Sequence, residues 1–75
     1  MQGDQILDCK GLSCPMPIMK LAIAMKKLDT GKVIELLGTD PGSKEDVPAW
    51  CDRTGNSLLE VVEEDDGFTF FIRKE

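Results

Sequence analysis

The sequence contains no histidine, and aromatic residues make up only 5% of its 75 positions. Without histidine, a cysteine has no imidazole to take its proton, so hydrolases that use a Cys-His pair are excluded. Long apolar runs are also missing. The longest, from Ile18 to Met25, contains Lys20 and falls short of the ~20 residues that span a bilayer. We therefore expect no membrane-spanning segment.

The chain has three cysteines, and no CxxC pair occurs among them. Cys9 and Cys14 are five residues apart and Cys51 is distant, which does not match the ligand spacing of a structural zinc site. The opening residues MQGDQ lack the basic and apolar segments of a signal peptide. An odd cysteine count without a signal peptide argues against a disulfide framework. We therefore expect a cytoplasmic protein that needs no metal and no organic cofactor.

Acidic residues outnumber basic ones, and the net charge of −5 argues against direct binding to nucleic acid. The charge is uneven, because the stretch from Lys10 to Lys32 is basic whereas residues 38–75 carry ten acids against four bases. A protein partner could use that polarity for steering. The length is that of one small domain, residues 1–75. We expect it to be a monomer whose apolar faces are used by a single core.

Glycine and proline divide the chain into short elements. The patterns predict strands over residues 5–9, 32–37, 57–63 and 68–73. A first helix opens at Pro15 or Pro17, since proline suits a first turn, and ends at residues 29–31. Its predicted apolar face, at helical spacing, consists of Ile18, Leu21, Ala22, Met25 and Leu28.

A second helix is predicted between residues 43 and 54. Ser43 and Asp46 resemble a capping box at its start, and Pro48 would kink the helix or delay its beginning. The order is therefore βαβαββ. Two helices cannot cover both faces of four strands, so we expect an α+β fold, a two-layer sandwich with a mixed sheet and both helices on one face.

The unusual feature is Cys14-Pro15-Met16-Pro17, placed between a strand and a helix. A helix N-terminus stabilises anions, and the nucleophilic form of cysteine is the thiolate. We therefore expect the start of the helix to lower the pKa of Cys14. Spacing alone leaves a second interpretation open, in which Cys14 is a small apolar residue under a loop.

The segment from Leu7 to Pro17, LDCKGLSCPMP, resembles the signature of the TusA/SirA sulfur-carrier family, L-D-x-R-G-x-x-C-P-x-P. The resemblance continues through Gly38-Thr39-Asp40-Pro41, the helix with Trp50 and Cys51, and the terminal Ile72-Arg73-Lys74. It covers essentially the whole chain. The fold of the family, a two-layer βαβαββ sandwich, agrees with the order of elements predicted above.

The resemblance implies a sulfurtransferase that acts as a relay, with sulfane sulfur held as a persulfide on Cys14. The donor would be a cysteine desulfurase or a rhodanese-like protein, and the acceptor would be DsrE-like. Such relays serve tRNA thiolation, cofactor biosynthesis or sulfur oxidation. An alternative is a small regulatory or interaction domain with Cys14 as a redox switch, and a purely structural adaptor is a third option.

The resemblance also implies roles for neighbours of Cys14. Those that match the motif as scaffold, or as support or partner contact, are Pro15 and Pro17, and Asp8, Gly11 and Asp40, with Lys10 in place of the more usual arginine. Asp40 has two interpretations, as a turn former or as a group that influences Cys14 or receives a partner's cation. Lys20 belongs to a lysine face that is either simply exposed or a docking surface.

Periodicity places Cys9 and Cys51 in the core rather than in the reaction. Met16 and Met19 could form an apolar collar for a partner, although for Met19 we expect packing in the core, as its apolar side chain favours.

Overall fold

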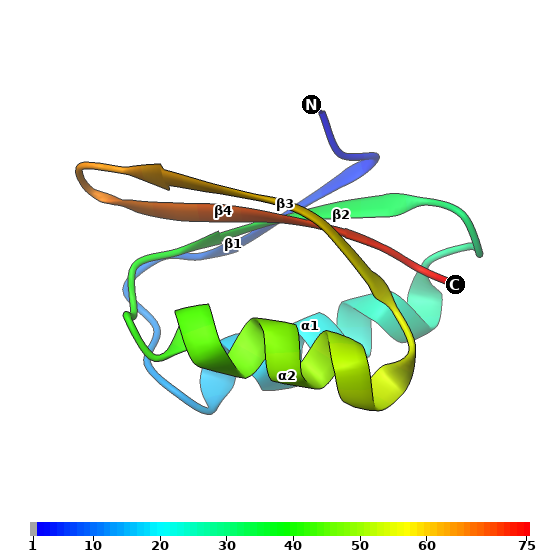
Figure 1. The fold of residues 1–75 in the computed structure, drawn as a ribbon, viewed down its shortest axis with the longest axis horizontal. Coiled ribbons are helices and arrows are strands. Elements are labelled where there is room, and N and C mark those ends of the chain that lie inside the picture. The colour runs from blue at the N-terminus through cyan, green and yellow to red at the C-terminus, as the bar shows by residue number, and fades with distance from the viewer. Residues whose placement is uncertain (1) are drawn as a thin grey trace.

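The computed structural model describes residues 2–75. Six elements follow one another in the order β1 (Gln5–Cys9), α1 (Met16–Lys27), β2 (Val33–Gly38), α2 (Ser43–Thr54), β3 (Ser57–Glu64) and β4 (Gly67–Arg73). Figure 1 shows a single sheet with both helices on one of its faces. The predicted α+β sandwich is therefore confirmed, and each predicted strand boundary lies within one residue of the observed one.

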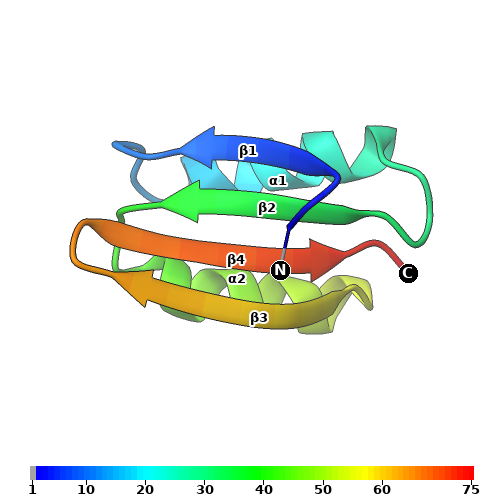
Figure 2. The ribbon, with the colours of Figure 1, turned by 90° about the horizontal axis from the view of Figure 1, so that it is seen from above.

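The sheet has the strand order β1-β2-β4-β3. β1 and β2 are parallel, whereas β4 is antiparallel to both of its neighbours, so the sheet is mixed as predicted. Figure 2 shows that β1 and β2 end on the same side of the molecule and that both helices begin there. This arrangement follows from the parallel pair, because parallel neighbours place their carboxyl ends at one edge. The loops that follow β1 and β2 therefore meet.

The core lies between the helices and the facing side of the sheet. β2 alternates buried and partly exposed positions, which is the period of two expected for a strand with one face on a core. The fully or almost fully buried apolar residues of this cluster are Cys9, Leu21, Ala24, Met25, Ile34, Leu36, Val47, Trp50, Cys51, Phe70 and Ile72.

Helix α1 packs its predicted apolar face against the core, but Met19 lies outside that face. Met19, expected in the core, is 51% exposed because it lies two positions from buried Leu21, and such neighbours point in nearly opposite directions around a helix. Met16 and Ile23 are also exposed, so the core does not use every apolar side chain of α1. Both helices have 12 residues, and within residues 2–75 neither is long and apolar enough to cross a membrane.

The predicted capping box at the start of α2 is absent. Ser43 is the first helical residue and is buried, while Gly42 occupies the N-cap without a side-chain bond. Pro48 lies inside α2 and neither delays its start nor interrupts it before Thr54. Gly55 then ends α2 in the left-handed region with φ of 77°, a conformation that glycine adopts at little cost.

Candidate functional site

The loop between β1 and α1 carries Cys14 and is fastened to the loop between β2 and α2. The main-chain N–H of Gly11 donates to Thr39 Oγ1 at 2.9 Å, and that of Cys14 donates to Asp40 Oδ2 at 2.8 Å. Gly11 has φ of 80°, a left-handed conformation that lets the chain turn sharply here. Two segments more than 25 residues apart in sequence therefore fix the position of the exposed thiol.

Asp40 joins this loop to the start of α2. Its Oδ1 accepts from the N–H of Gly42 at 3.1 Å, and its main-chain oxygen accepts from the N–H of Ser43 at 3.0 Å. The same carboxylate therefore shapes its own turn and holds Cys14. The sequence left open whether Asp40 forms a turn or influences Cys14. In the structure Asp40 does both, because one carboxylate oxygen accepts from Gly42 and the other accepts from Cys14.

The start of α1 offers Cys14 fewer N–H groups than the motif suggested. α1 begins at Met16, with Pro15 as the N-cap and a cis peptide bond between Cys14 and Pro15. The N–H of Met16 already donates to the oxygen of Ser13 at 3.0 Å, and Pro17 has no N–H. Pro15 and Pro17 therefore leave the first turn of α1 with fewer main-chain N–H donors for a thiolate at Cys14.

The expectation that the helix start makes Cys14 more acidic is wrong. The pKa of the Cys14 thiol is raised, chiefly by a hydrogen bond with the Asp46 carboxylate. Slight desolvation and the negative charges of Asp46 and Asp40 raise it further. Asp46 and Asp40, which lie at and before the start of α2, therefore raise the pKa of the Cys14 thiol.

The other two cysteines lie in the core, as the sequence predicted. Cys9 is 0% exposed and Cys51 is 3% exposed, and all three cysteines are free thiols. Burial raises the pKa of Cys51 to about 11, with a further contribution from Asp52. Burial also raises the pKa of Cys9, partly offset by Lys20. Cys14 alone of the three combines exposure with a position in a loop.

The other residues that the sequence predicted for the site, Asp8, Lys10 and Lys20, occupy different surroundings. Asp8 Oδ1 accepts the N–H of Lys10 at 3.0 Å and so shapes the turn after β1. Lys10 lines a shallow pocket with Glu64 and Asp66 of the β3–β4 hairpin. Lys20 lines a groove between α1 and β1. Cys14, Gly11 and Asp40 are thus linked through the two joined loops, whereas Lys20 faces β1.

Sequence reasoning missed two contributors to the site. Thr39 was noted only as part of a matching segment, and Asp46 was assigned to a capping box that does not form. Asp46 is 32 positions from Cys14 along the chain, so no spacing pattern connects them. The available signal was topological, because a parallel β1–β2 pair brings the segments after both strands to one edge.

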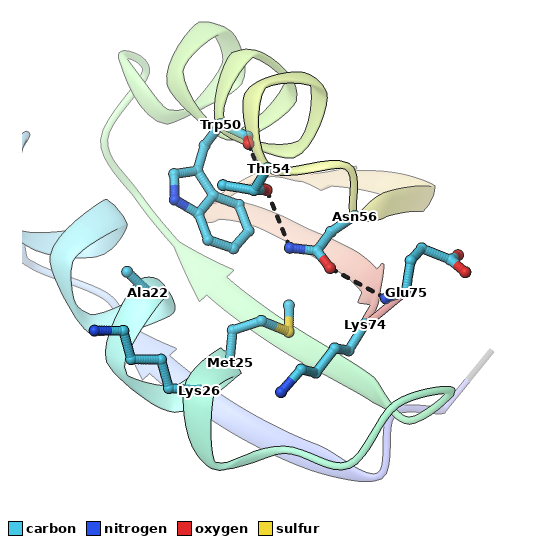
Figure 3. Close-up of a pocket in the computed structure, with 8 residues that line it drawn as sticks. All are labelled: Ala22, Met25, Lys26, Trp50, Thr54, Asn56, Lys74 and Glu75. Atoms are coloured by element: carbon cyan, nitrogen blue, oxygen red, sulfur yellow. Dashed lines mark hydrogen bonds between the residues drawn. The ribbon is translucent and has the colours of Figure 1, made fainter.

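A hollow of about 350 Å³ lies at the other end of the molecule (Figure 3), and the residues that line it are Ala22, Met25, Lys26, Trp50, Thr54, Asn56, Lys74 and Glu75. Four of the lining residues, Trp50, Thr54, Asn56 and Glu75, are linked by hydrogen bonds. Thr54 Oγ1 donates to the oxygen of Trp50 at 2.7 Å, Asn56 Nδ2 to Thr54 Oγ1 at 3.0 Å, and the N–H of Glu75 to Asn56 Oδ1 at 3.1 Å. These bonds connect Glu75 to the end of α2, and none of the residues that form them carries a thiol.

No group of three or more Cys, Asp or Glu side chains in residues 2–75 is arranged to hold a metal ion. The chemistry that the described residues offer is therefore that of one accessible thiol beside two carboxylates.

Known proteins resemble the chain over nearly its whole length. The model of the family described as sulfurtransferase TusA matches residues 5–74. YrkI of Bacillus subtilis (strain 168) is 45% identical over 74 residues, which is 99% of each chain. The sulfur carrier protein TusA of Allochromatium vinosum is 42% identical over 71 residues, covering 95% of this chain and 93% of that protein.

A solved structure has the same fold. The crystal structure of a SirA-like protein from Desulfitobacterium hafniense superposes with a TM-score of 0.78, covering 95% of this chain and 99% of that one, at 23% identity. The βαβαββ sandwich is thus shared between chains that differ at most positions.

Proposed function

We propose, because the chain belongs to the TusA family of sulfurtransferases, that Cys14 carries sulfane sulfur as a persulfide from a donor protein to an acceptor protein. The observation that carries this proposal is the contrast between the cysteines. Cys14 is exposed on a fastened loop, whereas Cys9 and Cys51 are buried. An incoming sulfur atom can therefore reach one thiol of the three.

The reaction needs only thiol chemistry. Cys14 Sγ, as the thiolate, attacks the outer sulfur of a donor persulfide, and a new S–S bond forms as the donor's S–S bond breaks. The donor leaves as a thiolate and takes a proton, so the step involves no net oxidation or reduction. In the second half, an acceptor thiolate attacks the outer sulfur on Cys14, and the Cys14 thiolate leaves. The sulfur is the cargo, and no resident cofactor takes part.

We further propose the classes of protein that serve as partners. A cysteine desulfurase or a rhodanese-like protein would load Cys14, and a DsrE-like protein would unload it, in a cytoplasmic relay for tRNA thiolation, cofactor biosynthesis or sulfur oxidation. The exposed Met16 and Met19 lie two and five positions after Cys14 and offer apolar surface to such partners. Lys10 and Lys20 add positive charge on the same part of the chain.

The alternative of a redox switch is less well supported. An intramolecular disulfide would need a second accessible thiol, and Cys9 and Cys51 are 0% and 3% exposed. A carrier needs only Cys14.

The test is intact-mass spectrometry after incubation with a cysteine desulfurase and cysteine. The expected result is a gain of one sulfur atom that a reductant removes. Cys14→Ser should gain nothing, and Cys51→Ser, as the matched control, should gain the sulfur as the natural chain does. A gain of equal size in Cys14→Ser would contradict the proposal.

A further inference from the structure

The hollow between the second halves of α1 and α2 has an apolar floor. It holds about 350 Å³, and small-molecule sites in proteins begin at about 300 Å³. Met25 of α1 and Trp50 of α2 line it and are 4% and 6% exposed, and half-buried Ala22 lies beside them. Figure 3 shows the indole of Trp50 extending from α2 toward α1. The hollow therefore has the size and the apolar lining that a small ligand needs.

The indole N–H of Trp50 has no acceptor within residues 2–75. Trp50 takes part in side-chain hydrogen bonding only through its main-chain oxygen, which accepts from Thr54 Oγ1. Every completely buried side-chain nitrogen or oxygen in this part of the chain has a partner, so the unpaired indole nitrogen keeps contact with solvent. Figure 3 shows that nitrogen on the side of the ring turned away from Thr54 and Asn56. A tryptophan buried to this degree usually bonds its N–H to the protein, so this donor is available to a ligand.

The other polar groups of the hollow leave few free acceptors. Asn56 Oδ1 accepts the N–H of Glu75 at 3.1 Å, and Thr54 Oγ1 accepts from Asn56 Nδ2 at 3.0 Å. The carboxylate of Glu75 pairs with Arg73 Nη2 at 2.7 Å. A ligand that binds here must therefore bring acceptors rather than donors.

The charges at the rim favour an anion. Lys26 is exposed, and neither Lys26 nor Lys74 forms an ion pair within the described chain from residue 2 onward. Lys74 Nζ donates to the main-chain oxygen of Leu28 at 2.7 Å and so offsets the partial negative charge at the end of α1. Glu75, the one carboxylate that lines the hollow, is already matched by Arg73. The rim thus presents two ammonium groups that lack a carboxylate partner.

We propose that this hollow binds a small carboxylate with an apolar body, of the aryl- or alkyl-acetate class. The apolar body covers Met25 and Ala22, one carboxylate oxygen accepts the N–H of Trp50, and Lys26 balances the charge from the neighbouring helix. Cys14 is not among the residues that line the hollow, so this site is separate from the one that carries sulfur.

The first test uses the natural chain. Trp50 is the single tryptophan and the chain has no tyrosine, so indole fluorescence reports directly on the hollow. Titration with phenylacetate should change this fluorescence to saturation, with half-saturation in about the millimolar range for a ligand of about ten non-hydrogen atoms. Phenylacetamide, of the same shape without the charge, and 2-phenylethylamine, of the opposite charge, should bind at least about 5-fold more weakly. The absence of saturation, or equal binding of either control compound, would overturn the proposal.

Methionine methyl resonances locate the bound ligand. Met25 lines the hollow, whereas Met16 and Met19 are exposed near the start of α1 and do not line it. Phenylacetate should shift the methyl resonance of Met25 and leave those of Met16 and Met19 in place. Shifts at Met16 or Met19 without one at Met25 would place the ligand elsewhere and overturn the proposal.

Two variants separate the charge from the hydrogen bond, with Met25 as the reporter. Lys26→Gln should weaken phenylacetate binding about 2–5-fold, as expected of an exposed ion pair. Lys27→Gln is the matched control, because Lys27 follows in the same turn but lines the groove between α1 and β1. Trp50→Phe keeps an apolar ring, removes the N–H and should weaken binding about 10-fold. Equal effects of the two lysine substitutions, or unchanged binding to a folded Trp50→Phe chain, would contradict the proposal.

Dilution of the protein without ligand completes the test. Trp50 fluorescence should not depend on protein concentration, and a dependence would mean that a second copy of the chain fills the hollow, which would also overturn the proposal. None of these experiments uses a sulfur donor or Cys14. Their failure therefore leaves the persulfide assignment intact.

Discussion

Asp40 Oδ2 accepts the main-chain N–H of Cys14 at 2.8 Å, across 26 positions of sequence. This bond connects the reactive loop to the turn that starts α2, because the other oxygen of Asp40 accepts the N–H of Gly42. The position of the sulfur thus depends on tertiary contact between the loops after β1 and β2, and several measurable consequences follow from that dependence.

Asp40→Ala should lower the free energy of unfolding by about 1–2 kcal/mol, because two main-chain N–H groups lose a charged acceptor. A hydrogen bond to a charged group contributes about 1.5–3 kcal/mol, and exposure to water reduces that contribution here. Urea unfolding followed by Trp50 fluorescence measures it. Asp66→Ala, in the exposed hairpin, is the control and should change little. Equal effects of the two substitutions would mean that Asp40 does not hold the loop.

Labelling of the three cysteines should be strongly unequal in the folded protein. Iodoacetamide should modify Cys14 first because it is exposed, and the rate should increase with pH as its raised pKa is approached. Cys51, with a pKa of about 11 and 3% exposure, should react only on unfolding. Peptide mass spectrometry gives the order, and equal labelling of all three would contradict the burial described above.

Pro17→Ala should destabilise the protein by about 1–2 kcal/mol. Pro17 is fully buried at the second position of α1, so the substitution removes packed ring carbons at about 0.8 kcal/mol each and frees the unfolded backbone. Met16→Ala, at the exposed position beside it, is the control and should stay within about 0.5 kcal/mol of the natural chain. Chemical denaturation of the two variants compares them. If Pro17→Ala is as stable as the control, its ring does not contribute to the core.

Reversing the charge of single lysines should show whether they guide a sulfur donor toward Cys14 or only keep the protein surface hydrated. Lys10→Glu and Lys20→Glu should lower the association rate with an acidic sulfur donor, since charges at the rim of an interface act on association. Lys26→Glu is the matched control, because Lys26 lines the hollow at the opposite end of the molecule from Cys14. Stopped-flow transfer rates should also fall as salt rises, because the Debye length shrinks from ~10 Å at 0.1 M to ~3 Å at 1 M. Transfer rates that do not change with salt, with Lys10→Glu or with Lys20→Glu, or that Lys26→Glu lowers equally, would contradict steering by these lysines.

The fold was largely predictable from the sequence because its signals are local. The apolar residues of β2 and the glycine that ends α2 indicate the type and length of these elements, and few topologies join βαβαββ in one sheet. The errors arose where an apolar residue lies off the buried stripe. Met19 was assigned to the core on composition, although its angle around α1 places it in solvent.

The sequence marks Cys14, which is the exposed cysteine of the three, but it does not predict which charged groups affect the pKa of its thiol. The prolines beside Cys14 mark it in the sequence, but Asp46, which contributes most to raising the pKa of its thiol, is 32 positions away on α2. The first turn of α1 also offers Cys14 few donors, because Pro17 has no N–H and the N–H of Met16 is bonded to the oxygen of Ser13. Long-range contacts of this kind leave no trace in residue spacing.

The most direct test of the carrier assignment is to locate the sulfur within the loaded protein. After reaction with a cysteine desulfurase and cysteine, persulfides are capped by alkylation and the peptides are sequenced by tandem mass spectrometry. The account predicts the additional sulfur on the peptide that contains Cys14 and on neither peptide that contains Cys9 or Cys51. An additional sulfur on Cys9 or Cys51 in the folded chain, with Cys14 unmodified, would contradict it.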